Sequence, residues 1–297
     1  MDQQDWLAGQ FEEQRPHLRA VAYRMLGSLS EADDAVQDAW LRLSRTDTSE
    51  VENLRAWLTT VVARVALNML RSRRTRHEEP LDVRVPDPII DSANGTDPEH
   101  EALLADSVGL ALLIVLETLT PAERLSFVLH DMFAVPFDEI APIVERSPEA
   151  TRQLASRARR RVRGADPPVP DADLTAQWEV VEAFLTAARE GDFDALVAVL
   201  DPDVVLRADR GATGRSQHLR GAQTVAGQAL LFRRLDLTMR RALVNGAAGV
   251  VTFLHGKPFS ICAATIKNGR IAEMDFLADP ERVARLDLTV LMTDGQE

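Results

Sequence analysis

The chain has 297 residues, 45% of them hydrophobic and 27% charged, so it can bury two or three hydrophobic cores and is neither disordered nor fibrous. A single cysteine, Cys262, excludes a disulfide framework or a zinc site of several thiolates, and no uncharged stretch approaches the roughly 18 residues that span a bilayer, so we expect a cytoplasmic protein. The net charge of −12 argues against general affinity for nucleic acid, yet the acidity is concentrated in the middle of the chain.

The first 76 residues predict a bundle of three helices. Apolar residues recur on one face of 11–26, a second helix opens at Ser30 with Asp33 completing a capping box, and a third helix carries an apolar stripe from Leu54 to Met69. The second helix keeps an acidic face opposite its apolar one. We therefore place the first all-α domain at 1–76.

Residues 77–102 are acidic, contain four prolines and show no sustained period, which is typical of a linker. Helical periodicity returns at 103–119, and Thr120 followed by Pro121 predicts the start of a helix that continues to 133. A short apolar helix at 137–144 and a tight turn precede a last helix that starts at Ser147. The order predicts a helix-turn-helix domain at 103–164.

A second proline-rich break covers 165–171, and the signals then change to helices followed by strands. Two helices are expected within 174–200, a strand at 203–209 and a helix at 220–233, before an antiparallel meander with Asn-Gly turns. This order predicts an α+β domain at 172–297.

The last helix of the helix-turn-helix outline carries the strongest basic feature of the chain. Its first turns offer Arg, Gln and Ser side chains that could read base edges, and the later arginines could neutralise phosphates. The candidate DNA-binding residues there are Arg152, Gln153, Ser156, Arg157, Arg159, Arg160 and Arg161. A solvated amphipathic helix whose arginines only maintain solubility is the structural alternative. A second cluster, Arg71, Arg73, Arg74 and Arg76, could contact phosphates or complement the C-terminal dipole of the third helix.

Three segments carry a family resemblance: MLGSLSEADDAVQDAWLRL, NLRAWLTTVVARVALNMLRSRR and LTPAERLSFVLHDMFAVPFDEIAPIVERSPEATRQLASRARRRV. Across residues 10–164 the chain resembles the extracytoplasmic-function (ECF) sigma factors of bacterial RNA polymerase, in the sigma-70 family. The resemblance implies that 1–76 is the sigma region 2 domain, which melts the minus-10 element, and that 103–164 is the region 4 domain, which reads the minus-35 element. The implied partners are promoter DNA and core RNA polymerase, at its beta-prime clamp and beta flap, which removes the objection raised by the negative charge.

The same resemblance assigns roles to two faces of region 2. Core-polymerase-binding residues would be Asp33, Asp34, Gln37, Asp38 and Leu41, whereas Trp40 and Leu43 belong to the bundle core. Arg64, Asn68 and Arg71 would face promoter DNA. Many members of the family have Asp where Asn68 stands, so no promoter sequence is predicted.

The C-terminal domain resembles the SnoaL-like, NTF2-like cone appended to one subset of these sigma factors, where it is thought to replace a separate anti-sigma protein. VRVPDPI and DRGATGR are degenerate counterparts of that subset's Trp-Leu-Pro-Glu-Pro and glycine-rich motifs, and ADPERVARL is similar to its C-terminal segment. The implied regulatory contacts are Asp209, Arg215, Asp275, Asp279, Pro280 and Arg282.

The alternative is a stand-alone helix-turn-helix regulator with a ligand-binding or isomerase/cyclase-like C-terminal domain. Candidate bases for such an enzyme are Asp209, His218 and Asp275, although Asp209 is expected in an exposed ion pair and Asp275 on a strand surface. No phosphate loop, metal-binding helix or nucleophile elbow is present in the sequence. We expect no catalytic residue, metal or cofactor, a monomer when free, and room for a small ligand in the C-terminal domain, with Cys262 as a buried apolar residue.

Overall fold

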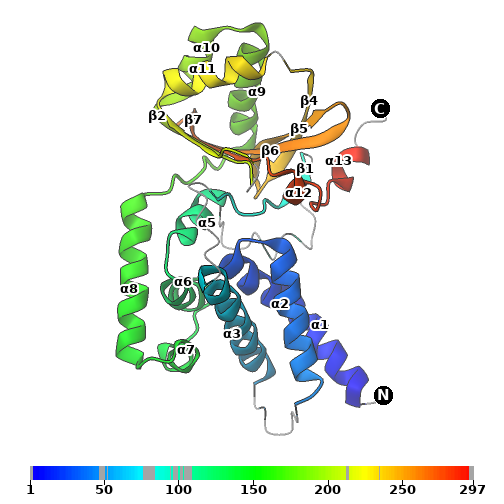
Figure 1. Cartoon of the computed structure of the whole chain (residues 1–297), viewed down its shortest axis with the longest axis vertical. Coiled ribbons are helices and arrows are strands. Elements are labelled where there is room, and N and C mark those ends of the chain that lie inside the picture. Colours follow the sequence, from blue (N-terminus) through cyan, green and yellow to red (C-terminus); the bar gives the residue numbers. More distant parts are fainter. Residues whose placement is uncertain are drawn as a thin grey trace. The chain divides into compact units, whose positions relative to one another are not determined.

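The computed structural model describes residues 3–46, 51, 53–75, 84–93, 95, 100, 103, 109–211, 214–233 and 235–293. The chain divides into two compact units, which Figure 1 shows as helices and as a sheet covered by helices. Unit 1 comprises Met1–Glu79, Pro98–Asp106 and Val115–Asp166, and unit 2 comprises Pro80–Asp97, Ser107–Ile114 and Pro167–Glu297. Within the described residues, no helix is both long enough and apolar enough to cross a membrane.

Unit 1 begins with three mutually packed helices, α1 (Gln3–Leu26), α2 (Leu29–Leu43) and α3 (Leu54–Thr75). The predicted apolar faces of all three are buried, with Leu18, Val36 and Val62 at most 1% exposed. The predicted start of the second helix at Ser30 is wrong. Gly27 takes a left-handed φ of 63° directly after α1, which leaves Ser28 as the N-cap, and its hydroxyl accepts a hydrogen bond from the Glu31 amide.

The helix-turn-helix part of unit 1 comprises α6 (Pro121–Phe127), η1 (Val128–Met132), α7 (Phe137–Val144) and α8 (Pro148–Ala165), after α5 (Leu110–Glu117). The predicted Thr120 cap is confirmed as a full capping box with Glu123. The predicted single helix over 121–133 is instead α6 followed by a π-helical turn. Ser147 caps α8, and Glu145 is left-handed at the end of α7, so the tight turn stands where expected.

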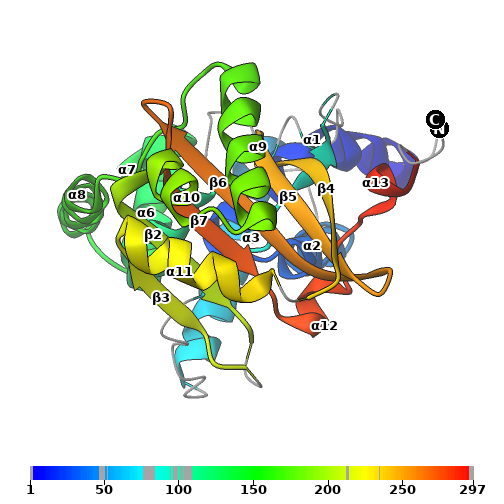
Figure 2. The ribbon, with the colours of Figure 1, turned by 90° about the horizontal axis from the view of Figure 1, so that it is seen from above.

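Unit 2 contains a seven-stranded sheet in the order β1-β4-β5-β6-β7-β2-β3. The strands are β1 (Ile90–Ser92), β2 (Leu200–Asp209), β3 (Gln217–Arg220), β4 (Leu237–Val244), β5 (Ala247–Leu254), β6 (Lys257–Lys267) and β7 (Arg270–Leu277). Helices α9 (Leu174–Glu190), α10 (Phe193–Val199) and α11 (Ala222–Phe232) cover one face, as Figure 2 shows from above. Two short helices follow the sheet, α12 (Pro280–Val283) and α13 (Thr289–Thr293).

The expected antiparallel meander is confirmed for β4 to β7, but three features of the sheet were not predicted. Strand β2 pairs with β7 in parallel, because the chain returns through β3 and α11 before it enters the meander. Strand β3 lies between the predicted strand at 203–209 and the predicted helix at 220–233, where no strand was expected. Strand β1 comes from the segment expected to be a linker, and it pairs antiparallel with β4 at the sheet edge.

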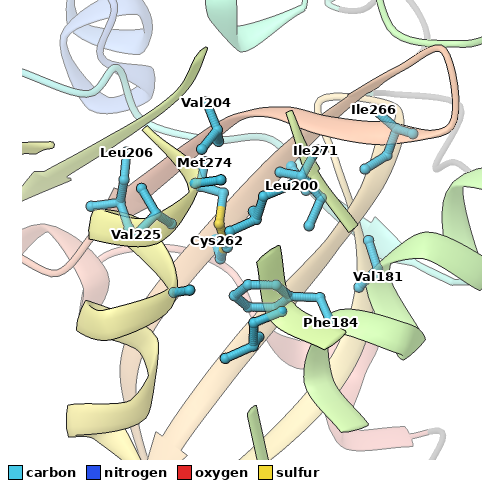
Figure 3. Close-up of a cluster of buried hydrophobic side chains, with 14 of the residues drawn as sticks. Val181, Phe184, Leu200, Val204, Leu206, Val225, Cys262, Ile266, Ile271 and Met274 are labelled. Atoms are coloured by element: carbon cyan, nitrogen blue, oxygen red, sulfur yellow. The ribbon is translucent and has the colours of Figure 1, made fainter. Parts of the chain in front are cut away.

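The core of unit 2 lies between the sheet and helices α9 and α11. Figure 3 shows Phe184 of α9 and Val225 of α11 with Cys262 and Met274 of the sheet. Cys262 is 7% exposed, which confirms its expected place as a buried apolar residue. Burial raises the pKa of its thiol, so this group stays protonated and unreactive.

Candidate functional site

Helix α8 exposes the side chains predicted to read DNA. Arg152, Gln153, Ser156 and Arg157 are all exposed, and Arg160 follows on the same side of the helix. The opposite side is buried through Thr151, Ala155 and Ala158, which pack against α6 and α7. A helix with one buried face and one basic, exposed face after a tight turn has the geometry of a recognition helix.

Several α8 arginines also bind acidic residues of unit 1. Glu123 receives Arg157 at 3.3 Å and Arg161 at 3.1 Å, and Arg159 lies 2.7 Å from Asp131. Burial alone would raise the pKa of Glu123, but hydrogen bonds from Thr120 and the charges of Arg161 and Arg157 lower it, so the carboxylate stays ionised. Glu123 therefore orients the α8 arginines as well as capping α6.

The candidate polymerase-binding face of α2 is exposed and acidic. Asp33, Asp34, Gln37 and Leu41 are exposed, with Leu41 at 43%, and Asp38 is half-buried beside Arg42. Asp33 binds Arg19 of α1 at 2.7 Å. Trp40 packs on Phe11 at a ring-centroid distance of 5.1 Å, and Leu43 is fully buried, as expected for bundle core. An exposed leucine between acidic residues is suited to a partner that offers both apolar and basic groups.

The predicted DNA face of α3 separates into exposed and engaged residues. Arg64, Asn68 and Arg71 are exposed at spacings of four and three residues, which places them on one side of the helix. Arg73 instead binds Glu31 and donates to the Leu26 carbonyl, so it links α3 to the junction of α1 and α2. The side chain of Arg74 lies outside the described residues.

Unit 2 binds the segment between the two helical regions. Residues 84–92 run along the sheet and end in β1, whose Ile90 pairs with Val244. Val85 and Ile89 are at most 1% exposed, and the Ile89 amide and carbonyl both bond Asn245 of the β4–β5 turn. This is addition of an extended segment to a sheet edge, which uses backbone hydrogen bonds for affinity.

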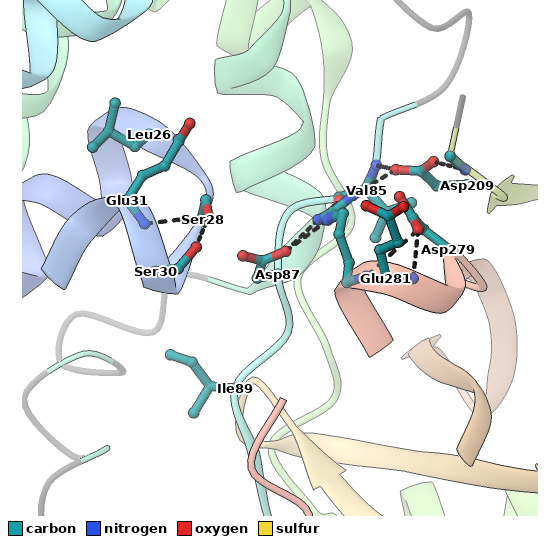
Figure 4. A network of polar contacts seen from close by, with 12 residues as sticks. Leu26, Ser28, Ser30, Glu31, Val85, Asp87, Ile89, Asp209, Asp279 and Glu281 are labelled. Carbon is teal, nitrogen blue, oxygen red and sulfur yellow. Dashed lines mark hydrogen bonds and ion pairs between the residues drawn. The ribbon is translucent and has the colours of Figure 1, made fainter. Parts of the chain in front are cut away.

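Arg282 is the polar centre of this linker-binding site, and Figure 4 labels three of its partners, Val85, Asp87 and Asp209. Its guanidinium donates to Asp87 at 2.5 and 2.8 Å, to Asp209 at 2.8 Å and to the Val85 carbonyl at 2.6 Å. The Val85 amide in turn donates to Asp209 at 3.0 Å. One arginine thus joins the linker to the sheet through charge-assisted hydrogen bonds.

Residues near Arg282 fix its position. Asp279 is the N-cap of α12, and its Oδ1 accepts from the amides of Glu281 and Arg282, with Pro280 at the first helical position. Gly211 has a φ of 68°, and a Cβ there would lie 2.4 Å from the Asp279 carboxylate. Only glycine therefore allows this approach of the 211 loop to α12.

Asp209 and Asp275 are buried, contrary to expectation. Asp209 is 0% exposed and binds the linker, whereas an exposed ion pair was predicted, because the linker and α12 cover it. Asp275 is 2% exposed and shares Arg207 with Glu273 at 2.7 Å each. Burial raises the pKa of Asp275 and raises that of Glu273 to about 7, although Arg207 opposes both shifts.

The three candidate bases do not meet at one cavity. Asp209 and Asp275 lie on β2 and β7 but do not line the cavity enclosed by α9, α11 and the sheet, and His218 is exposed on β3. Arg215 is also exposed, outside the linker-binding site. No group of three or more metal-ligating side chains occurs among the residues that the structure describes.

Sequence reasoning missed Asp87, Asn245 and the linker strand. The composition of 77–102 is that of a solvated linker, and no local pattern reveals that a distant Arg282 neutralises Asp87. An available signal was the alternation in VRVPDPII, where Val85 and Ile89 are buried.

Comparisons with known proteins agree with this arrangement. Residues 10–76 match Sigma-70 region 2, and residues 110–162 match Sigma-70, region 4. The chain is 37% identical to the ECF RNA polymerase sigma factor SigJ of Mycobacterium tuberculosis over 92% of both chains. It is 34% identical to the probable ECF sigma factor SigI of the same species, over 94% of this chain and 96% of that protein. The crystal structure of SigJ matches with a TM-score of 0.75 and 35% identity, covering 93% of this chain and 98% of that chain. The protein thus belongs to the extracytoplasmic-function sigma factors of the sigma-70 family, with an added helix-and-sheet C-terminal domain.

Proposed function

We propose that this protein directs core RNA polymerase to promoters through the exposed faces of α2, α3 and α8. The observation that carries the proposal is the exposed polar set on α8, whose members Arg152 and Gln153 lie outside the core. The exposed side of α3 that carries Arg64 would meet the minus-10 element, and α8 the minus-35 element. The acidic face of α2 would bind the beta-prime clamp, and region 4 the beta flap. Such a subunit works beside the chromosome, in the cytoplasm.

The test is transcription from a cognate promoter with purified core polymerase. The promoter is first found by sequencing transcripts made by the reconstituted holoenzyme on genomic DNA. Replacing Arg152 and Gln153 by Ala should reduce transcription and shift the preferred minus-35 sequence, whereas core binding should stay unchanged. Equal weakening on every sequence would make these residues phosphate contacts and not readers of bases.

We further propose that unit 2 regulates the sigma factor by holding its inter-region linker. The linker that buries Val85, Asp87 and Ile89 in unit 2 also joins the two promoter-binding regions, so its docking limits the separation that they can reach. A weak contact between the linker and unit 2 suffices for regulation, because both belong to one chain and the short tether gives the linker a high effective concentration at unit 2. The free protein would be a closed monomer that polymerase opens.

Deleting 168–297 tests this regulation. We expect the truncated protein to bind core polymerase and to give an altered level of promoter-dependent transcription. Deleting only the segment from Asp279 should have a similar effect, because it removes Arg282. Equal transcription by all three proteins would show that the C-terminal unit plays no regulatory part.

Catalysis is not part of this proposal, because the cavity of unit 2 is lined by no Asp, Glu or His among the described residues. A general base is required by the isomerase and cyclase reactions considered for such a fold. We propose instead that unit 2 binds a small ligand as part of the regulation.

A further inference from the structure

The cone of unit 2 encloses an apolar cavity of about 260 Å³ between the sheet and helices α9 and α11. Its walls include Phe184, Leu206, Cys262 and Met274, of which Figure 3 shows the side chains. An engineered apolar cavity of about 150 Å³ holds benzene, with six carbons, so this one has room for about ten. A well-packed core leaves few voids larger than a water molecule, which makes a space of this size a candidate binding site.

Two hydroxyl groups stand in this apolar wall without a partner. Thr252 and Ser260 are 6% and 5% exposed, and both line the cavity. They are directly paired across β5 and β6, so their side chains lie next to each other on one face of the sheet. Neither hydroxyl has a hydrogen-bond partner among the residues that the structure describes. Hydroxyls that line a cavity inside a protein normally bind a partner there, and a bound molecule would supply one.

The other polar groups of the wall gather at the same end of the sheet. Leu277 of β7 pairs with Asp209 on one side and with Ile261 on the other. Arg210 follows Asp209 and Ser260 precedes Ile261, so Arg210 and Ser260 lie at the same end of the sheet. Gln217 pairs with Ala208 next to it, and Gln228 of α11 lies 3.5 Å from Gln217. The cavity therefore has a polar end.

Its opposite end is apolar. Ile271 lines it and pairs with Leu200 on one side and Ile266 on the other. Arg210 is the only charged residue in the lining, and no carboxylate in the described part of the chain forms an ion pair with it. A cation at one end of an otherwise apolar space selects for an anion with an apolar body.

We propose that unit 2 binds an apolar monocarboxylate of about ten carbons, with its carboxylate near Arg210, Thr252 and Ser260. The inference deepens the proposed regulation by unit 2, since it names the chemistry of its ligand. Binding would stabilise the sheet whose edge strand β4 pairs with the linker strand β1.

The experiment measures binding of hexanoate, octanoate and decanoate to the full-length protein by calorimetry, with decan-1-ol and decylamine as probes of the head group. We expect affinity to rise with chain length to decanoate, to fall at least tenfold for the alcohol and to vanish for the amine. Arg210→Gln should remove the preference for the acid over the alcohol.

A cavity-filling variant shows where the probe binds. Ala229→Phe, on the cavity side of α11, should abolish binding, whereas Leu231→Phe on the same helix, 65% exposed, should leave it unchanged. Circular dichroism at rising temperature checks that both variants fold. If Ala229→Phe does not fold, the loss of acid preference in Arg210→Gln still tests the site. No saturable binding of any carboxylate, equal binding of acid and alcohol, or binding that survives in a folded Ala229→Phe would overturn the inference. The calorimetry measures ligand binding alone, so a negative result there would not contradict the proposed role of the linker. Likewise, truncated proteins that transcribe like the full-length protein would not contradict the measured ligand binding.

Discussion

Replacing Arg282 by Gln should release the linker from unit 2 while the sheet stays folded. The guanidinium joins Asp87 and the Val85 carbonyl to Asp209, and the three side chains are between 0 and 18% exposed. A neutral glutamine at this position would remove the positive charge that the two carboxylates share, which weakens the docked state. The linker can relieve that cost by moving Asp87 into water.

The size of the effect follows from these contacts. Removing one partner of a buried ion pair costs about 3–5 kcal/mol when the other charge stays buried. Since undocking relieves part of this, we expect docking to weaken by about 3 kcal/mol, which is roughly a 150-fold change in the docking equilibrium. A loss of this size is expected to shift the linker toward the undocked state.

Hydrogen exchange of the backbone amides reports this equilibrium directly. The amides of Val85 and Ile89 donate to Asp209 and Asn245 in the docked state, so their protection should fall by about two orders of magnitude. Arg285→Gln, also after the α12 cap but exposed, is the matched control and should leave protection unchanged. Amides of β6 should stay protected in both variants. Unchanged exchange at Val85 in Arg282→Gln would refute the role of Arg282.

Three further results are expected. Arg152→Ala should weaken promoter recognition by about 1–3 kcal/mol in a competition assay between cognate and altered minus-35 sequences, and uniform loss would contradict base reading. Asp34→Lys should weaken core-polymerase binding in a pull-down with little change in unfolding free energy. Glu13→Lys on α1, which is also exposed, should leave core-polymerase binding unchanged. Equal effects of the two substitutions would remove α2 from the interface. Burial raises the pKa of the Glu273 carboxyl in the folded state to about 7, so the folded state binds more protons than the unfolded state. The unfolding free energy of unit 2 should therefore fall by about 1.4 kcal/mol per pH unit as the pH rises from roughly 5 to 7. Glu273→Gln should flatten that slope in chemical denaturation, and an unchanged slope would assign the titration elsewhere.

The helical half of the protein was predictable because its determinants are local. Apolar spacing gave the buried faces of α1 to α3, and the Thr120-Pro121 and Ser147-Pro148 signals gave the starts of α6 and α8. The error at Ser30 shows the limit of such signals. Two serines compete to cap the same helix, and the left-handed Gly27 directly after α1 leaves Ser28 as the N-cap.

The linker-binding site could not be predicted, because the linker binds residues more than a hundred positions further along the chain. Asp209 ends a strand in a charged sequence, where a carboxylate is normally exposed. It is buried because 84–92 and α12 pack over it. The resemblance to sigma factors did name Asp209, Asp279 and Arg282 as regulatory contacts. The structure places all three beside the linker, and their regulatory role stays a prediction.

The charge arrangement explains how such a contact can be both specific and reversible. When the linker leaves, Asp87 enters water, but Asp209 keeps Arg282 at 2.8 Å and the Gly211 amide at 3.0 Å. Undocking therefore leaves no buried charge without a partner, and the main loss is the burial of Val85, Ile89 and Ile90 together with the edge-strand hydrogen bonds. A site that required the linker to neutralise Asp209 would hold it permanently. Because Arg282 also binds Asp209, we expect unit 2 to stay folded when the linker is released. A partner such as polymerase could then compete with unit 2 for the linker.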